Sequence, residues 1–433
     1  MKIAIAGYGI EGESSYNYYS SDPSNEITIV DQKQPKRPLP QGVPTIIGQD
    51  VFSDKLTDFD LVIRTASLPP YQIKTNGKIW SATNEFFSKC PAQIIGVTGT
   101  KGKGTIASLI ASILEAAGKK VWLLGNIGVT SLDCLSQIIP SDIVVYELSS
   151  FQLWDIERSP HVAVVSLVEP EHLNVHTDFD DYVNAKANIR RFQTDGDICI
   201  FHPTNQSSLR ITKTSDKGKS IRYGILDDGG VYIKDNTFYQ VEHKICSIEA
   251  LQLIGKHNFE NACAAITVAK IYDITDANIE TGLKNFPGLP HRLEYIKEVN
   301  GVKYYNDSFS SSTPATVAAI QAFTQPEILI MGGIDRGGNF IEIADALSHQ
   351  NNIKYIIIIG EIRQKLSQII GAINPNIQVE SSNLQTMQAI VELAKSHAES
   401  GDVVILSPGC ASFDMFKDFY DRGDQFKQAV NSL

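Results

Sequence analysis

The chain has 433 residues, of which 42% are hydrophobic, 20% are charged and 9% are aromatic. At roughly 100 to 200 residues per domain, this length excludes a single compact core, and the composition excludes a disordered, collagenous or membrane chain. The net charge of −11 argues against broad binding to nucleic acid, so an anionic ligand must be held by local donors.

The six cysteines lie apart, without a Cys-x-x-Cys pair, which fits neither a disulfide framework nor a zinc site. The apolar runs stay far below the ~20 residues that span a bilayer. The first residues enter a strand-like run without the features of a signal peptide. We therefore expect a cytoplasmic protein with neither a membrane nor a nucleic-acid partner. We also expect a monomer, although nothing in these patterns determines the oligomeric state.

Short apolar runs bounded by Gly, Asp or Pro alternate with longer amphipathic stretches. This alternation is typical of buried parallel strands connected by helices, and it predicts an α/β fold throughout. The predicted strands are residues 3–6, 27–30, 61–63, 94–97, 121–124, 143–146, 162–167, 328–331, 355–359 and 403–406.

Two proline-containing segments, at 90–92 and 286–290, mark predicted domain boundaries. A turn-rich stretch at 204–244 predicts a small antiparallel β flap. We expect three domains: a Rossmann-like domain at 1–91, a central P-loop NTPase-like parallel sheet with the flap at 92–289, and a Rossmann-like domain at 290–433.

The first predicted strand runs into Gly7-Tyr8-Gly9-Ile10-Glu11-Gly12, and Asp31 ends the next strand about 20 residues later. This is a complete G-x-G-x-x-G dinucleotide fingerprint. Taken in isolation, it predicts a nicotinamide-dependent dehydrogenase.

A second glycine-rich segment follows the strand at 94–97 and precedes a predicted helix. In Gly99-Thr100-Lys101-Gly102-Lys103-Gly104-Thr105, backbone amides can cradle phosphates while Lys103 reaches the β and γ oxygens. The segment departs from the standard P-loop at Val97, where glycine is usual, and at Gly104, where a hydroxyl is usual. Thr105 is then the nearest hydroxyl for magnesium.

Three further residues are candidates for the same site. Glu147 ends the strand at 143–146, at the edge where open α/β sheets bind ligands, and it is either a magnesium ligand or a solvated strand end. His172 follows the strand at 162–167, and Lys186 lies on the next predicted helix. A lone histidine or helix lysine is usually structural, so their roles depend on the combination with the phosphate loop.

Seven motifs in chain order resemble those of the ATP-dependent Mur ligases, over the whole chain. The 147–153 string and the 407–414 segment look most like the type that adds D-glutamate. The resemblance implies an amide ligase that joins D-glutamate to UDP-N-acetylmuramoyl-L-alanine through an acyl phosphate. The motifs are Gly99-Thr100-Lys101-Gly102-Lys103, Gly125-Asn126-Ile127-Gly128, Glu147-Leu148-Ser149-Ser150-Phe151-Gln152-Leu153, Glu171-His172-Leu173, Gly255-Lys256-His257-Asn258-Phe259-Glu260-Asn261, His291-Arg292 and Asn306-Asp307-Ser308.

The resemblance also implies residue roles. Lys103 would bind the ATP phosphates, and one or two magnesium ions would be held by Thr105, Glu147, His172 and a carbamylated Lys186. Without the resemblance, Lys186 would be an ordinary helix-surface lysine. The remaining implied contacts are Asn258, Asn261, His291, Arg292 and Asp307 for the nucleotide, Gly9, Ile10, Glu11 and Asp31 for the UDP group, Asn126 for the muramoyl peptide, and Ser311, Arg336, Ser412 and Phe419 for the amino acid.

The sequence differs from the family motifs at two places, and several alternative functions stay open. Phe309 stands where the D-glutamate-adding type often has lysine, and Ser67-Leu68-Pro69-Pro70 lacks the usual Pro-Gly. The alternatives are another Mur ligase, a folylpolyglutamate synthase, a nicotinamide-dependent oxidoreductase and an inert nucleotide-binding regulator. Residues 1–91 argue against the synthase, because that family has no N-terminal UDP-binding domain.

Overall fold

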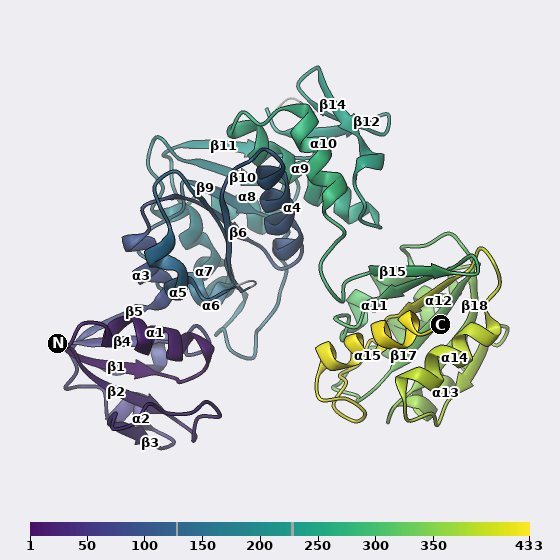
Figure 1. Ribbon diagram of the computed structural model, residues 1–433, viewed down its shortest axis with the longest axis horizontal. Coiled ribbons are helices and arrows are strands. Elements are labelled where there is room, and N and C mark those ends of the chain that lie inside the picture. The colour runs from purple at the N-terminus through teal and green to yellow at the C-terminus, as the bar shows by residue number, and fades with distance from the viewer. Residues whose placement is uncertain (127–128, 227–228) are drawn as a thin grey trace. The chain divides into compact units, whose positions relative to one another are not determined.

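The computed structural model describes residues 1–126, 129–226 and 229–433 (Figure 1). Ile127 and Gly128 of the predicted 125–128 motif therefore lie outside the described residues. The chain forms two compact units: one contains Met1–Leu251 and Phe259–Phe286, and the other contains Gln252–Asn258 and Pro287–Leu433. The boundaries expected at 91/92 and 289/290 stay predictions.

The N-terminal part of the first unit is a parallel sheet in the order β3-β2-β1-β4-β5. Ile3 and Ile5 pack on the side of α1, whereas Ala4 and Ala6 pack on the side of α2, so both faces of β1 are covered (Figure 1). The elements are β1 Lys2–Ala6, α1 Ile10–Ser20, β2 Glu26–Asp31, β3 Thr45–Ile47, α2 Val51–Asp54, β4 Leu61–Arg64 and β5 Lys78–Ser81.

The second sheet of this unit has six parallel strands in the order β11-β10-β9-β6-β8-β7. The inner strands β6, β8, β9 and β10 are buried on both faces, which explains their nearly continuous apolar sequences. The elements are α3 Ala82–Lys89, β6 Gln93–Thr98, α4 Lys103–Ala116, β7 Val121–Gly125, α5 Ser131–Cys134, β8 Ile143–Glu147, α6 Ser150–Leu153, β9 Val162–Val165, α7 Phe179–Arg191, β10 Ile198–Phe201, α8 Gln206–Thr212 and β11 Lys219–Arg222.

The predicted bounds of the antiparallel flap, 204–244, are wrong. An antiparallel sheet forms from β12 Val231–Lys234, β13 Thr237–Gln240 and β14 His243–Ser247. The earlier part of the stretch instead forms α8 and β11, because Asn205 caps the helix through the Ser208 amide (2.9 Å) and β11 pairs in parallel with β10. The helices α9 Lys256–Ile271 and α10 Asp276–Asn285 follow, and α10 packs on α4.

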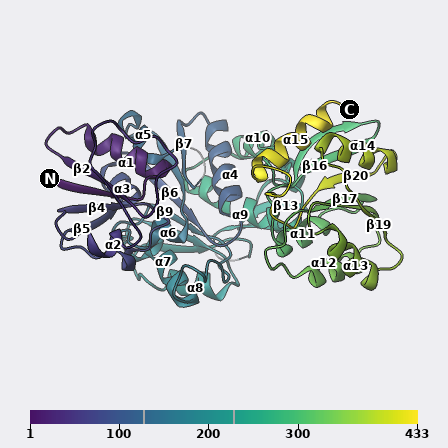
Figure 2. The same cartoon turned by 90° about the horizontal axis from the view of Figure 1, so that it is seen from below.

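The second unit contains a six-stranded sheet in the order β15-β16-β20-β17-β18-β19, parallel except for the β15–β16 pair. Helices α11 to α13 cover one face and α14 and α15 cover the other (Figure 2). The elements are β15 Glu294–Val299, β16 Val302–Asn306, α11 Thr313–Ile320, β17 Glu327–Gly332, α12 Phe340–Ser348, β18 Ile353–Ile359, α13 Arg363–Ile373, β19 Gln378–Ser381, α14 Met387–His397, β20 Val403–Leu406 and α15 Phe419–Asn431.

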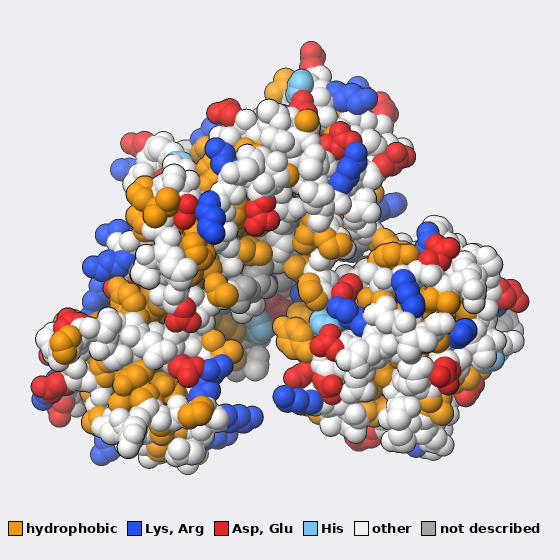
Figure 3. All heavy atoms as spheres, viewed as in Figure 1, with side chains coloured by type: hydrophobic (Ala, Val, Ile, Leu, Met, Phe, Trp, Pro, Cys, Tyr) orange, Lys and Arg blue, Asp and Glu red, His pale blue; other side chains and the backbone are white. Residues whose placement is uncertain are grey.

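The predicted α/β class with parallel sheets is confirmed. On the face drawn in Figure 3, basic and acidic side chains are interspersed on both units. Within the described part of the chain, no helix is both long enough and apolar enough to cross a membrane.

Candidate functional site

The glycine-rich loop between β6 and α4 has a backbone that favours glycine. Gly99 has φ +153° and Gly102 has φ +85°, and a Cβ on Gly99 would lie 1.8 Å from Ser166 Oγ. Gly102 is the N-cap of α4, so Lys103 is the first helical residue. The first amides of a helix have no intrahelical acceptor, and this end of α4 is therefore suited to bind phosphate.

The segment that follows β9 holds this loop. The Thr100 amide donates to the Leu167 carbonyl (2.7 Å), and Ser166 Oγ donates to the Lys101 carbonyl (2.7 Å). The Glu169 amide donates to Thr100 Oγ1 (2.9 Å). The loop is thus ordered by the protein itself, which lowers the entropy that a ligand must remove on binding.

Two lysine side chains donate to carbonyls of the loop. Lys103 Nζ donates to the Thr100 carbonyl (3.0 Å). Lys186, on α7, is 1% exposed, and its Nζ donates to the Gly99 carbonyl (2.8 Å). The alternative that Lys186 is an ordinary helix-surface lysine is wrong, because this side of α7 is buried.

Burial holds the pKa of Lys186 well below its usual value, and the charge of Lys103 lowers it further. The carboxylates of Glu171 and Glu147 oppose this shift. A lowered pKa increases the fraction of Lys186 that is the neutral amine, and only the neutral amine has a lone pair for bond formation. Lys186 therefore lies within electrostatic range of Lys103, Glu147 and Glu171.

Glu147 is the last residue of β8 and is only 4% exposed. The alternative that it is a solvated strand end is therefore wrong. Its carbonyl accepts from the Asn126 amide (3.2 Å), which places the exposed Asn126 beside it. His172 has a left-handed backbone (φ +57°). Its ring is half-exposed and lies 5.0 Å from the Phe151 ring, and its Nε2 lies 3.6 Å from Glu171 Oε2.

The ligand atoms around the loop fit a magnesium ion that also binds water and phosphate. They do not fit a metal ion whose ligands are all protein side chains. Among the residues that the structure describes, no group of three or more His, Cys, Asp or Glu side chains is arranged to hold a metal ion. Magnesium needs only one or two carboxylates, because water and phosphate oxygens complete its shell. Glu147 supplies such a carboxylate, and Thr105 lies half-buried in the first turn of α4.

A separate cleft of about 650 Å³ lies at the carboxyl ends of β1 and β4. Asp31 lines it, and its carboxylate accepts from the amides of Tyr8 (2.8 Å) and Lys33 (3.2 Å). Glu11 lines it too, accepts from the Ala66 amide (2.7 Å) and has a pKa raised by burial. The cleft therefore contains the predicted Gly9, Ile10, Glu11 and Asp31.

The three glycines of the first fingerprint differ in what they do. Gly7 has φ +92°, and a Cβ on Gly12 would lie 2.1 Å from the Gly7 carbonyl oxygen. A Cβ on Gly9, by contrast, would meet no atom within 4 Å. Gly7 and Gly12 are thus required by the fold, whereas Gly9 leaves open space where a ligand's phosphates can approach the backbone.

Sequence reasoning assigned no role to several other residues that line this cleft. Ser67, Leu68 and Tyr71 come from the loop after β4, and Asn174 and Val175 follow His172. The loop after β4 could have been identified, because parallel strands place their carboxyl ends at one edge of the sheet.

In the second unit, the predicted nucleotide contacts lie close together. His291 is buried, its Nδ1 lies 2.9 Å from Asn306 Nδ2, and burial lowers its pKa. Asp307 accepts from the Leu293 amide (3.1 Å) and from Ser407 Oγ (2.8 Å), and burial raises its pKa to about 6.

Phe309 has a defined place in the same unit. The Arg292 guanidinium lies 4.0 Å from the centre of the Phe309 ring, and that ring meets the Phe419 ring edge-on at 5.0 Å. The aromatic ring therefore carries an arginine on its face, which supplies a cation beside Phe309.

The predicted amino-acid contacts are brought together only in part. Arg336 is exposed and lies over the Phe413 ring, next in sequence to the buried Ser412. Ser311 is exposed and accepts from Arg422, which sequence reasoning missed.

Arg422 is 1% exposed and connects several loops of this unit. Its guanidinium donates to the Cys410 carbonyl (3.1 Å) and the Ser308 carbonyl (2.9 Å). Ser308 Oγ in turn donates to the Phe419 carbonyl (2.8 Å). The next residue, Gly423, packs against His291, because a Cβ there would lie 2.1 Å from His291 Nδ1.

The two predicted asparagines of α9 are both buried. Asn258 Nδ2 donates to the Ile254 carbonyl (2.7 Å), as a residue at a helix start does. Asn261 lies beside the phosphate loop, because a Cβ on Gly102 would be 2.5 Å from Asn261 Oδ1.

Comparison with known proteins gives consistent family matches. The Mur ligase middle domain matches residues 97–269, and the Mur ligase glutamate ligase domain matches residues 291–410. A curated relative from Clostridium tetani, named UDP-N-acetylmuramoylalanine–D-glutamate ligase, is 36% identical and covers 100% of this chain and 97% of its own. A relative of the same name from Clostridium acetobutylicum is 35% identical, with 100% and 96% covered.

Solved structures agree at the level of the fold. The UDP-N-acetylmuramate–alanine ligase of Thermotoga maritima superposes with a TM-score of 0.63 at 16% identity, and the match covers 100% of this chain and 99% of that one. The MurF ligase of Thermotoga maritima in complex with ADP gives 0.59 at 14% identity, with 99% and 94% covered.

Proposed function

The chain belongs to the Mur ligase family, and we propose that it adds D-glutamate to UDP-N-acetylmuramoyl-L-alanine with ATP, as a cytoplasmic enzyme of peptidoglycan precursor synthesis. The observation that carries this proposal is the junction at the phosphate loop. There Lys103 and the buried Lys186 donate to loop carbonyls beside Glu147. The dinucleotide fingerprint of a nicotinamide-dependent oxidoreductase does not account for these lysines.

We propose three domains along the predicted boundaries. Residues 1–91 bind the UDP group in the cleft that Gly9 and Asp31 line, and the strand order β3-β2-β1-β4-β5 supports a Rossmann-like domain. Residues 92–289 bind ATP at the P-loop-like segment. Residues 290–433 bind D-glutamate and contribute His291, Arg292 and Asp307 to the nucleotide.

The proposed reaction has two steps. The carboxylate of the muramoyl-alanine attacks the γ-phosphate and releases ADP, which forms an acyl phosphate. The amine of D-glutamate then attacks the acyl carbon, loses a proton and displaces phosphate. Lys103 neutralises charge on the transferring phosphoryl oxygens, and this contribution is largest in the transition state.

Bound magnesium would neutralise phosphate oxygens. Glu147, Thr105 and His172 would hold it, together with Lys186 if that lysine is carbamylated. The neutral Lys186 amine would attack CO2, form an N–C bond and release a proton, which leaves an anionic carbamate whose oxygens can bind magnesium. The lowered pKa of Lys186 supports this chemistry, because it increases the reactive fraction.

For D-glutamate, we propose that Arg336 pairs with a carboxylate, while Ser311, Ser412 and Phe419 form the rest of the pocket. None of these four side chains is an anion that could pair with a second ammonium group. The missing lysine at Phe309 is compensated in part by Arg292, whose guanidinium lies on the Phe309 ring.

A phosphate-release panel tests the function. With ATP, magnesium and UDP-N-acetylmuramoyl-L-alanine, release should depend on D-glutamate and be weak with L-glutamate, L-lysine or meso-diaminopimelate. A preference for L-lysine or diaminopimelate would make the chain another Mur ligase. A response to folate with L-glutamate would make it a folylpolyglutamate synthase-type enzyme, and no release with any amino acid would contradict ligase activity.

A further inference from the structure

Arg64 is the last residue of β4 and is 1% exposed, which is rare for an arginine. Its Nη1 donates to the carbonyls of Ala66 and Leu68, each at 3.2 Å. Both acceptors belong to the loop after β4 that forms one wall of the 650 Å³ cleft. One side of the guanidinium therefore shapes the cleft.

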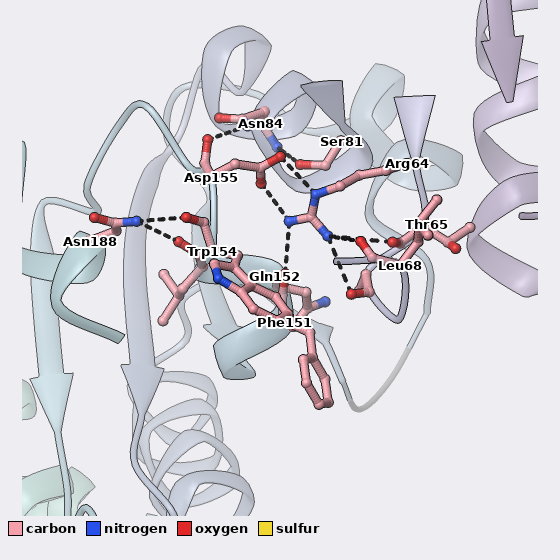
Figure 4. Close-up of polar contacts among 12 residues, drawn as sticks. Arg64, Thr65, Leu68, Ser81, Asn84, Phe151, Gln152, Trp154, Asp155 and Asn188 are labelled. Carbon is pink, nitrogen blue, oxygen red and sulfur yellow. Dashed lines mark hydrogen bonds and ion pairs between the residues drawn. The ribbon is translucent and has the colours of Figure 1, made fainter. Parts of the chain in front are cut away.

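The other side of the guanidinium binds the segment that follows Glu147 (Figure 4). Nε donates to Asp155 Oδ2 (2.7 Å), and Nη2 donates to Asp155 Oδ1 and to the Phe151 carbonyl (2.8 Å). Phe151 lies in α6, which begins three residues after Glu147 through a capping box formed by Ser149. Arg64 therefore joins the cleft wall to the segment that carries Glu147.

The polar groups of this junction are well satisfied. Every guanidinium nitrogen of Arg64 donates, and the bidentate pair with Asp155 offsets the cost of burying the charge. The Asp155 carbonyl accepts from Asn84 Nδ2 (2.9 Å), so the acceptor side is itself fixed (Figure 4). Such a fully bonded junction has one low-energy geometry.

A second contact connects the same loop to the segment after His172. Tyr71 Oη donates to the Val175 carbonyl (2.8 Å), and the Tyr71 ring meets the Trp154 ring edge-on at 5.8 Å. Arg64 and Tyr71 thus attach the two ends of the 65–72 loop to the segments that follow Glu147 and His172.

We propose that Arg64 is a positioning residue, which sets the UDP-binding cleft relative to the phosphate loop and so delivers the substrate carboxylate to the γ-phosphate. This inference rests on the proposed function. Arg64 and Asp155 would set the distance between the UDP-binding cleft and the phosphate loop, which bind the two ends of the reacting pair. This distance matters, because a misplacement of about 1 Å at a reacting atom can cost about 100-fold in rate.

Arg64→Lys tests the proposal, because one ammonium group cannot replace a bidentate fork that also donates to four backbone carbonyls, including that of Thr65 (3.4 Å). We expect the KM for UDP-N-acetylmuramoyl-L-alanine to rise at least about tenfold and kcat to fall, while the KM values for ATP and D-glutamate stay within about twofold. Asp155 does not line the cleft, and Asp155→Asn should shift the same kinetic constants in the same direction. This second variant tests the proposal if Arg64→Lys does not fold.

Lys78→Met is the matched control. Lys78 Nζ donates to Glu157 Oε2 (3.0 Å) and so crosses between the same two sheets, but both side chains are half-exposed and neither lines the cleft. Its kinetic constants should match those of the wild type. If the folded Arg64 and Asp155 variants lose only thermal stability, or if all three KM values rise equally, the proposal is overturned.

Direct binding of the UDP substrate, measured by calorimetry without ATP, separates this proposal from the proposed function. Binding that is equal in wild type and in both variants would overturn the positioning role even if the ligase assay succeeds. Wild type that binds the UDP substrate but releases no phosphate would instead contradict the ligase assignment, and weaker binding in the variants would still support the role of Arg64.

Discussion

The first unit contains two glycine-rich turns with the same plan and opposite electrostatics. Each follows a central parallel strand, β1 or β6, and leads into a helix, α1 or α4. At the first turn, the acidic side chain of Asp31 accepts from the Tyr8 amide. At the second, the cationic side chains of Lys103 and Lys186 donate to loop carbonyls.

This difference in charge suits the first turn to ligand binding and the second to stabilising a reacting phosphoryl group. A carboxylate at a strand end can accept hydroxyl groups of a ribose, and it adds no positive charge where phosphates lie. Lysines beside a helix N-terminus stabilise charge that develops on a phosphoryl group. The backbone thus makes two glycine-rich turns, and the lysines at the second turn are the reason that we propose phosphoryl transfer there.

Removing a cation from the second turn should have the largest effect. Lys103→Ala should fold normally and lose at least about 100-fold in ligase turnover, as expected for one transition-state electrostatic contact. Phosphate release measures this loss. Lys101→Ala is the control, since Lys101 is exposed and paired with Glu169 (3.2 Å), and it should lose far less. Near-normal turnover in a folded Lys103 variant would remove the distinction between the two turns.

The second prediction concerns the metal that only the second turn should need. Glu147→Ala and His172→Ala should each raise the magnesium concentration for half-maximal activity at least about tenfold, because loss of even an outer partner of a metal site has that effect. Magnesium titrations of phosphate release at fixed ATP give the value. Lost activity with an unchanged magnesium titration would point to a role outside metal binding.

The third prediction concerns the buried lysine. If Lys186 acts as a carbamate, Lys186→Ala should lose activity and recover part of it when short carboxylic acids fill the cavity. NMR of wild type in ¹³C-labelled bicarbonate should also show a carbamate carbon that the variant lacks. An unmodified Lys186 beside bound ATP and magnesium in a crystal structure at neutral pH would refute this role.

The smallest expected effect separates the glycines of the first turn. Gly9→Ala should fold and weaken binding of the UDP substrate by about tenfold, roughly 1.4 kcal/mol, because its Cβ enters space left for phosphates. Gly12→Ala should instead lower the melting temperature, since its Cβ would lie 2.1 Å from a backbone oxygen. Calorimetry and thermal unfolding measure the two effects. The opposite pattern would contradict a binding role for this turn.

The sequence by itself was sufficient for features that are local in the chain. Both strand–loop–helix turns, and Glu147 at the end of its strand, follow from runs of a few residues whose periodicity and glycines determine backbone conformation. The motifs identified the family for the same reason, since each is a short string of residues around one turn. The flap was mislocated where α8 depended on a single cap at Asn205.

Only the tertiary structure decided which distant side chains meet. Arg64 and Asp155 are 91 residues apart and Lys186 lies 87 residues from Gly99, so no local pattern marks either contact. Burial then determined the chemistry, because removal from water lowers the pKa of Lys186 and makes an arginine such as Arg64 depend on its acceptors. Residue type and spacing are properties of the chain, whereas solvent exclusion is a property of the packed fold.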